Sequence, residues 1–217
     1  TAQEMIESLP VWGTLALTTL ELLATAAFAL SGIIEAARKR MDIVGICVVA
    51  FLAAFGGGTL RDLLLDQRPF FWVREQYVLA GVFALCLIAP LVIRQRHMAI
   101  TERMIEWPDA IGLGLFCASG VHQSHLAGMP PLVSVTIGVV TAVFGGVLRD
   151  LICNEIPATL RNHRPYAVCA FAGALLYLLL ATLNSPAWLA MGACAGLATS
   201  LRGLAIVRGW SLPAWKI

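Results

Sequence analysis

Charged residues are scarce in this sequence. Only 13% of the 217 residues are Asp, Glu, Lys or Arg, whereas 59% are hydrophobic and the mean hydropathy is +0.82. This composition excludes a disordered chain and an ordinary soluble enzyme, because neither could cover its surface with so little charge. A net charge of +2 is also too small for a basic nucleic-acid-binding surface. We therefore expect a membrane protein that binds lipids and no nucleic acid.

Catalytic and metal-binding motifs are absent as well. The sequence has no Walker loop, no His-Glu-x-x-His, no nucleophile elbow and no Cys-x-x-Cys spacing. The six cysteines lie in or beside apolar runs, which is typical of small buried residues. His122 and His125 have no carboxylate or cysteine beside them, so a surface turn is favoured over a zinc site. We expect that the protein is not an enzyme and that it has no catalytic residue, no metal-binding residue and no cofactor. Whether it binds a specific lipid is left open.

Long uncharged runs are abundant. About 20 apolar residues in a helix cross a bilayer core of about 30 Å. The runs 110–148 and 165–201 are about twice that long, and each contains a turn-forming segment. The first run, which precedes three basic residues, is expected to be a permanent helix and not a cleaved signal peptide. The sequence predicts one all-α membrane domain with seven transmembrane helices, at about 13–36, 43–65, 75–94, 108–125, 131–153, 164–183 and 186–206.

Basic residues gather in alternate loops. Cytoplasmic loops retain Lys and Arg, so this bias sets the expected orientation. The opposite loops hold only Arg68 and Arg74. The pattern predicts an external N-terminus and a cytoplasmic C-terminus. The residues assigned to the cytoplasmic side are Arg38, Lys39, Arg40, Arg94, Arg96, Arg103, Arg161, Arg164, Arg202, Arg208 and Lys216.

The sequence also contains an internal duplication. A shift of 88 positions aligns residues 28–69 with 116–157, with 12 identities in 42 positions. Each unit has three helices, and a unit with an odd number of helices must cross the membrane in opposite directions in its two copies. We therefore expect an inverted 3+3 repeat plus one C-terminal helix. The expected boundaries are about 13–95, about 104–184 and about 186–206.

The strongest local motif is a glycine run followed by Arg-Asp. It occurs as Gly56, Gly57 and Gly58 before Arg-Asp in the first repeat, and as Gly145 and Gly146 before Arg-Asp in the second. Consecutive glycines weaken a helix by about 1 kcal/mol each and allow a kink or break that lines a cavity. The alternative is close packing, because small residues let helix backbones approach in lipid. Its occurrence in both repeats favours the functional break.

Charged side chains follow these glycines at Arg61, Asp62, Arg149 and Asp150. A charge at membrane depth costs about 3 kcal/mol, so these residues should be paired or face water. Adjacent helix positions point about 100° apart, so we do not expect an Arg61–Asp62 pair. We expect partners across the repeat interface or an aqueous mouth, with snorkelling to the membrane surface as the alternative.

Three further polar residues lie in apolar runs. Ser31 and Ser119 occupy equivalent positions in the two repeats and are candidate oxygen ligands or helix-bending groups, although small-residue packing explains them equally well. Glu21 is the only carboxylate in a central apolar run. It is either a cation site or a residue near the membrane surface.

The doubled motif resembles that of the prokaryotic trimeric intracellular cation (TRIC) channels, which overlap a bacterial duplicated-domain family labelled glycine transporter. The resemblance covers roughly residues 15–207. It implies a homotrimer in the inner (plasma) membrane of a prokaryote, with a pore in each subunit that conducts K⁺ and also Na⁺. It also implies that glycine-kinked second and fifth helices line this pore. Phe144 replaces the first glycine in the second repeat, so the second break should be weaker. The implied pore or gating residues are Gly56, Gly57, Gly58, Arg61, Asp62, Gly145, Gly146, Arg149 and Asp150.

Three functions remain open at this point. A monovalent cation channel is favoured, because Ser, Thr, Gly and backbone carbonyls suffice for a K⁺ path. A secondary transporter of a small solute such as glycine is the alternative, and it would need paired polar anchors near mid-membrane. A structural scaffold is disfavoured, because it would not need charged pairs beside doubled glycines.

Overall fold

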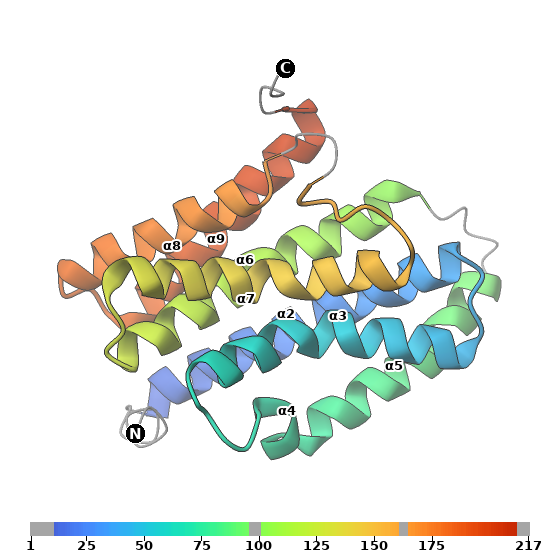
Figure 1. Ribbon diagram of the computed structural model, residues 1–217, viewed down its shortest axis with the longest axis horizontal. Helices are drawn as coiled ribbons and strands as arrows, with labels where there is room; N and C mark the ends of the chain where they lie inside the picture. Colours follow the sequence, from blue (N-terminus) through green and yellow to red (C-terminus); the bar gives the residue numbers. More distant parts are fainter. Residues whose placement is uncertain (1–10, 96–100, 161–164, 212–217) are drawn as a thin grey trace.

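The described part of the chain is almost entirely helical (Figure 1). The computed structural model describes residues 11–95, 101–160 and 165–211. All seven predicted helices are present, together with one short helix that the hydropathy did not predict. The helices are α2 (Val11–Arg38), α3 (Ile43–Leu64), α4 (Phe71–Arg74), α5 (Gln76–Gln95), α6 (Glu102–Leu126), α7 (Pro131–Ile152), α8 (Ala167–Thr182) and α9 (Ala187–Arg208).

Local sequence explains several helix ends. Asp42 caps α3, because its side chain accepts a hydrogen bond from the Gly45 amide at 2.8 Å. Pro131 occupies the first turn of α7, where its missing N–H has no helical partner to lose. Gly209 ends α9 in the left-handed conformation, with φ at 63°.

Helix α6 begins at residue 102, not at the predicted 108. The prediction placed the start where the uncharged run begins, because Glu102, Arg103 and Glu106 precede it. Charge limits which part of a helix can face lipid, but it does not prevent a helix from extending beyond that part. The additional turns end just before Pro108 and bring charged residues to one end of the molecule.

Four helices form the centre of the molecule. In Figure 1, α2, α3, α6 and α7 lie together, α5 lies on one side, and α8 and α9 lie on the other. Helix α5 packs against α2 and α3, whereas α8 packs against α6, α7 and α9. Helices α5 and α8 are thus the third helices of their repeats, and α9 is the additional C-terminal helix.

Equivalent residues of the two repeats meet at the centre. The rings of Phe28 and Phe116, which are 88 positions apart, stack with centroids 5.6 Å apart. Gly57 lies against the Thr141 carbonyl, and Gly145, the equivalent of Gly57, lies against the Ala53 carbonyl. Such reciprocal contacts arise when two copies are related by a pseudo-two-fold axis. The predicted inverted repeat is therefore confirmed.

The outer faces of the helices are apolar, as expected for a protein surrounded by lipid. Large exposed side chains include Leu87 on α5, Leu132 on α7 and Leu175 on α8. Helices α5 and α8 are apolar but shorter than the other candidate spans. By length and composition, four segments of the described chain can cross a membrane: Gly13–Arg38, Ile43–Leu64, Pro131–Ile152 and Ala187–Arg208. Several residues used to predict the orientation lie outside the described residues, namely Arg96, Arg161, Arg164 and Lys216.

Candidate functional site

Two clusters of buried charged and polar side chains lie at opposite ends of the four central helices. Arg61 is near the end of α3 and Arg149 near the end of α7, and these two helices pack antiparallel. We call them the Arg61 cluster and the Arg149 cluster. The first consists of Glu21, Arg61, Asp62, Ser119 and Gln123, and the second of Ser31, Asp109, Arg149 and Asp150.

The Arg61 guanidinium donates to groups from both repeats. Its Nη1 donates to Glu21 Oε1 at 2.5 Å and to Ser119 Oγ at 2.7 Å. Its Nε and Nη2 donate to Asp62 Oδ1 at 2.9 and 2.6 Å. Gln123 Nε2 donates a further bond to Glu21 Oε1 at 2.8 Å. Arg61 is only 1% exposed, so these bonds replace water completely.

The Arg149 cluster repeats this pattern at the other end. Arg149 Nη1 donates to Asp109 Oδ1 at 2.6 Å and to Ser31 Oγ at 2.9 Å. Arg149 Nε donates to Asp150 Oδ1 at 2.8 Å. Each arginine therefore binds two carboxylates of its own repeat, one from the aspartate that follows it and one from another helix. It also binds a serine of the other repeat.

The sequence-based prediction of cross-repeat partners is confirmed by Ser119 and Ser31, and snorkelling is excluded by the burial of both arginines. Asp109 was missed. It lies 88 positions after Glu21, so extending the self-alignment toward the N-terminus would have identified it. Tyr166 and Arg202 next to the Arg149 cluster were also missed as site residues, because the duplication does not extend to them without a change of register.

The prediction that Arg61 and Asp62 do not pair is wrong, and the same holds for Arg149 and Asp150. The 100° angle describes where the two side chains leave the helix, but an arginine is long enough to fold back to its neighbour. Each aspartate is also held in place by the segment that follows its helix. Asp62 Oδ2 accepts from the Phe71 amide at 2.9 Å, and Asp150 Oδ2 accepts from the Ala158 amide at 2.8 Å.

The sequence predicted a kink or a break at the glycines, and of these two a break is not present. Helices α3 and α7 continue through these residues without interruption. A methyl group on Gly57 would lie 2.1 Å from the Thr141 carbonyl oxygen, and one on Gly145 would lie 2.3 Å from the Ala53 carbonyl oxygen. These two glycines therefore make the close helix packing that the alternative interpretation describes.

The other glycines of the motif also make close contacts. A methyl group on Gly56 would meet the Leu148 side chain at 2.6 Å, and one on Gly58 would meet the Phe71 ring at 2.7 Å. The second repeat has Phe144 at the first of these positions without losing its helix. The absence of side chains thus lets α3 and α7 touch along their middle parts, between the two arginine clusters.

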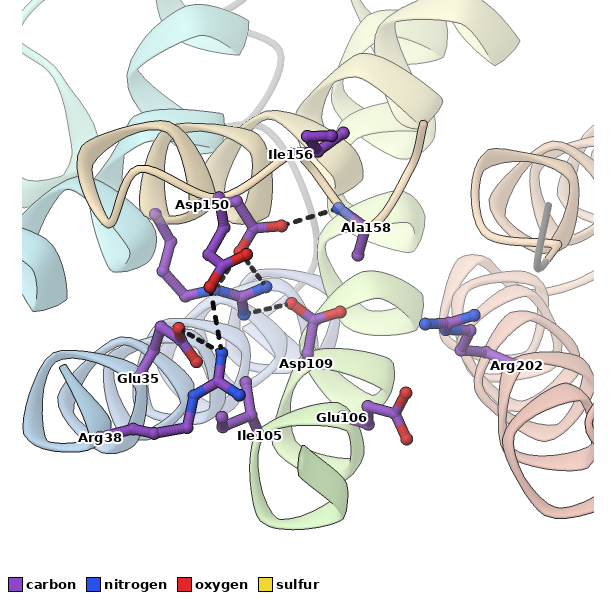
Figure 2. A pocket seen from close by; sticks show the side chains of 11 residues that line it. Glu35, Arg38, Ile105, Glu106, Asp109, Asp150, Ile156, Ala158 and Arg202 are labelled. Atoms are coloured by element: carbon purple, nitrogen blue, oxygen red, sulfur yellow. Dashed lines mark hydrogen bonds and ion pairs between the residues drawn. The ribbon is translucent and has the colours of Figure 1, made fainter. Parts of the chain in front are cut away.

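A small cavity adjoins the Arg149 cluster (Figure 2). Its volume is about 60 Å³, and five carboxylates but only three arginines line it. In Figure 2, Asp109 and Glu106 project from α6 while Arg202 extends toward them from α9. Ion pairs from Glu155 to Lys39 and Arg38 close the neighbouring edge between the two repeats.

Both clusters hold more negative than positive groups. Each has two carboxylates for one arginine, as in Glu21 and Asp62 around Arg61. Excess charge in a buried position is costly unless a proton or a cation balances it. The clusters are therefore sites to which cations are attracted, and at which an arginine occupies the position that a cation would take.

His122 and His125 lie in α6, not in the predicted surface loop. His122 is 1% exposed, and its Nδ1 lies 2.6 Å from Tyr177 Oη. The loop was predicted because polar residues interrupt the apolar run, but a polar residue remains helical when it finds a buried partner. In the described ranges, no three His, Cys, Asp or Glu side chains are placed to hold a metal ion.

A family model described as glycine transporter matches the chain twice, over residues 18–93 and 106–182. The UPF0126 inner membrane protein YadS of Escherichia coli K12 is 36% identical over 154 residues, which are 71% of this chain and 74% of that protein. A UPF0126 membrane protein of Deinococcus radiodurans is 38% identical over 168 residues, 77% of each chain. The two matches confirm the duplication.

Solved structures share the whole fold. The TRIC trimeric intracellular cation channel orthologue from Rhodobacter sphaeroides is 36% identical, with 89% of this chain and 98% of that chain covered and a TM-score of 0.79. A second structure, from work on conductance through TRIC cation channels, is 32% identical, with coverages of 92% and 97% and a TM-score of 0.81. These similarities confirm the predicted fold class and the prediction of a membrane protein that is not an enzyme.

Proposed function

Because the chain belongs to the glycine transporter (UPF0126) family and has the fold of the TRIC channels, we propose that it is a channel for monovalent cations, chiefly K⁺ and also Na⁺. The observation that carries this proposal is the pair of buried clusters, each with one arginine and two carboxylates. Their excess negative charge favours cations over anions and over neutral solutes.

The ion path runs through both clusters, one near each end of the central helices. Each arginine occupies the carboxylate and hydroxyl oxygens that a passing cation would use, so the described conformation is closed. Opening requires Arg61 and Arg149 to leave these oxygens. The contact at Gly57 and Gly145 has no interlocking side chains, so α3 and α7 can separate there without unpacking large residues.

The remaining features of the proposal follow the relatives. We infer a homotrimer with one path in each subunit, because one neighbour is a trimeric channel. The membrane is the inner membrane of a bacterium, as in the Escherichia coli relative. The Arg149 end faces the cytoplasm, because the loops beside it carry most of the basic residues.

Flux measurements on purified protein in liposomes test this function. Channel activity predicts that K⁺ leaves loaded vesicles down its concentration gradient. The rate of K⁺ efflux should increase with the gradient, and added glycine should not change it. The family description names glycine, so saturable uptake of labelled glycine is the competing outcome. Glycine uptake without K⁺ flux would replace the channel with a transporter.

A further inference from the structure

We propose that Arg38, Lys39 and Glu155 form an ionic latch that holds the Arg149 end of the molecule closed. This inference rests on the proposed function, because the latch acts on the guanidinium that blocks the ion path at that end. The latch joins the two repeats: Arg38 ends α2 and Lys39 follows it, whereas Glu155 lies in the segment after α7. It makes the two ends of the molecule open with unequal ease.

The first argument is the set of contacts that Glu155 makes. Its Oε1 accepts a hydrogen bond from the Lys39 ammonium and lies 3.7 Å from Arg38 Nη2. Arg38 Nη2 also donates to Glu35 Oε1 at 2.8 Å (Figure 2). The side chains of Lys39 and Glu155 are 31% and 27% exposed, whereas Glu35 is buried. The pair of Lys39 and Glu155 can therefore separate into water without exposing the core.

The second argument is the connection between the latch and Arg149. Glu155 lies in residues 153–160, which follow α7. In this segment the Ala158 amide donates to Asp150 Oδ2 at 2.8 Å, and Asp150 Oδ1 accepts from Arg149 Nε at 2.8 Å. Release of the segment removes one anchor of Asp150 and so loosens the carboxylate that orients Arg149. The latch therefore favours the conformation in which Arg149 occupies the ion path.

The third argument is the comparison with the Arg61 end, where the same turn occurs. Gln67 is the equivalent of Glu155 in the first repeat. The Gln67 amide donates to the Asp62 carbonyl at 2.8 Å, and the Glu155 amide donates to the Asp150 carbonyl at 2.8 Å. The two turns thus share their backbone hydrogen bond, and they differ in their side chains.

The side chains at the Arg61 end cannot form the latch. The equivalents of Arg38 and Lys39 are Leu126 and Ala127, which carry no charge. Within the described ranges, Gln67 Nε2 is buried and has no hydrogen-bond partner. One end of a nearly symmetric molecule is therefore held by an ion-pair network that the other end lacks.

Single-channel recording of purified protein in a planar bilayer tests the latch. Glu155→Gln should raise the ratio of open to closed time about two- to fivefold, which is the range expected for a partly exposed ion pair. Lys39→Gln should act in the same direction. The double variant should not exceed Glu155→Gln alone, because both changes remove the same contact. Glu75→Gln is the matched control, since it breaks a partly exposed pair with Arg74, 3.5 Å away in the α4–α5 segment, and should leave the ratio unchanged.

A chemical measurement in detergent keeps the test independent of conduction. Cys153, which is 3% exposed, lies at the start of the segment that carries Glu155. Its alkylation by N-ethylmaleimide, followed by peptide mass spectrometry, should be about two- to fivefold faster in Glu155→Gln than in the wild type. Cys86 on α5 is fully buried and serves as the internal control for global unfolding, so its alkylation rate should not change.

The outcomes separate the latch from the channel. If the wild type conducts K⁺ but Glu155→Gln has the same ratio of open to closed time and the same Cys153 alkylation rate, the latch is overturned and the channel stands. If Cys153 reacts faster in Glu155→Gln but the folded wild type and the variant carry no K⁺ current, the latch contact stands and the proposed function fails.

Discussion

Gly57→Ala should destabilise the protein although alanine is the better helix former. The added methyl carbon would lie 2.1 Å from the Thr141 carbonyl oxygen, whereas ordinary van der Waals contact begins at 3.4 Å. One of the two helices must therefore retreat by about 1.3 Å along a contact made of backbone atoms, which cannot rotate away. Overpacking of this kind costs about 1–3 kcal/mol.

The gain in helix propensity acts in the opposite direction and must be measured separately. It is about 1 kcal/mol for any glycine in a helix interior. Gly81 on α5 provides the control, because a methyl group there meets nothing within 4 Å. Gly81→Ala should therefore melt at the wild-type temperature or slightly above it.

Thermal unfolding in detergent, followed by tryptophan fluorescence, gives the comparison. A loss of about 2 kcal/mol lowers the melting temperature by about 4–8 °C for a chain of this size. Gly145→Ala should lower it similarly, since its methyl group would lie 2.3 Å from the Ala53 carbonyl oxygen. The double variant should lose less than the sum, because one separation of α3 and α7 relieves both clashes.

The refuting result is equally definite. If Gly57→Ala and Gly81→Ala melt at the same temperature, α3 and α7 do not touch at these glycines. The described contact between the two repeats at the centre of the molecule would then be wrong.

Three further predictions concern other contacts. Arg61→Ala leaves two buried carboxylates without their cation and should cost about 3–5 kcal/mol in thermal unfolding; adding Glu21→Gln should recover part of this loss, and no recovery would contradict the described pair. Phe28→Ala removes a fully buried ring from the centre and should cost about 3–5 kcal/mol, and a loss below 1 kcal/mol would place Phe28 outside the core. The partly exposed ion pair of Lys39 and Glu155 should show a coupling energy below about 1 kcal/mol in a double-mutant cycle, and a larger value would mean that this pair is shielded from water.

Sequence alone was sufficient for the fold because two independent signals agreed. The uncharged runs set the number of helices, and the 88-residue repeat set their relation to one another. The start of α6 was misplaced because hydropathy reports the lipid-facing length of a helix and not its hydrogen-bonded length. Helix α4 was missed because four residues are too short to give a periodic signal.

The candidate site was predicted in part. Arg61, Arg149, Ser31 and Ser119 were identified because each recurs in both repeats. Their pairing geometry could not be read from helix angles, because the conformation of a long side chain depends on its anchored neighbours. The close packing of the glycines could not be predicted with certainty, because the same residue type serves both bending and close packing, and the opposing Thr141 carbonyl is visible only in the fold.

Single-channel recording of the purified protein in a planar bilayer tests the central claim most directly. We expect discrete K⁺ currents in the wild type. Arg61→Ala and Arg149→Ala should each alter the conductance or the open probability, because each change removes a guanidinium group that blocks the ion path. The absence of unitary currents from wild type and both variants, in protein shown to be folded, would contradict it.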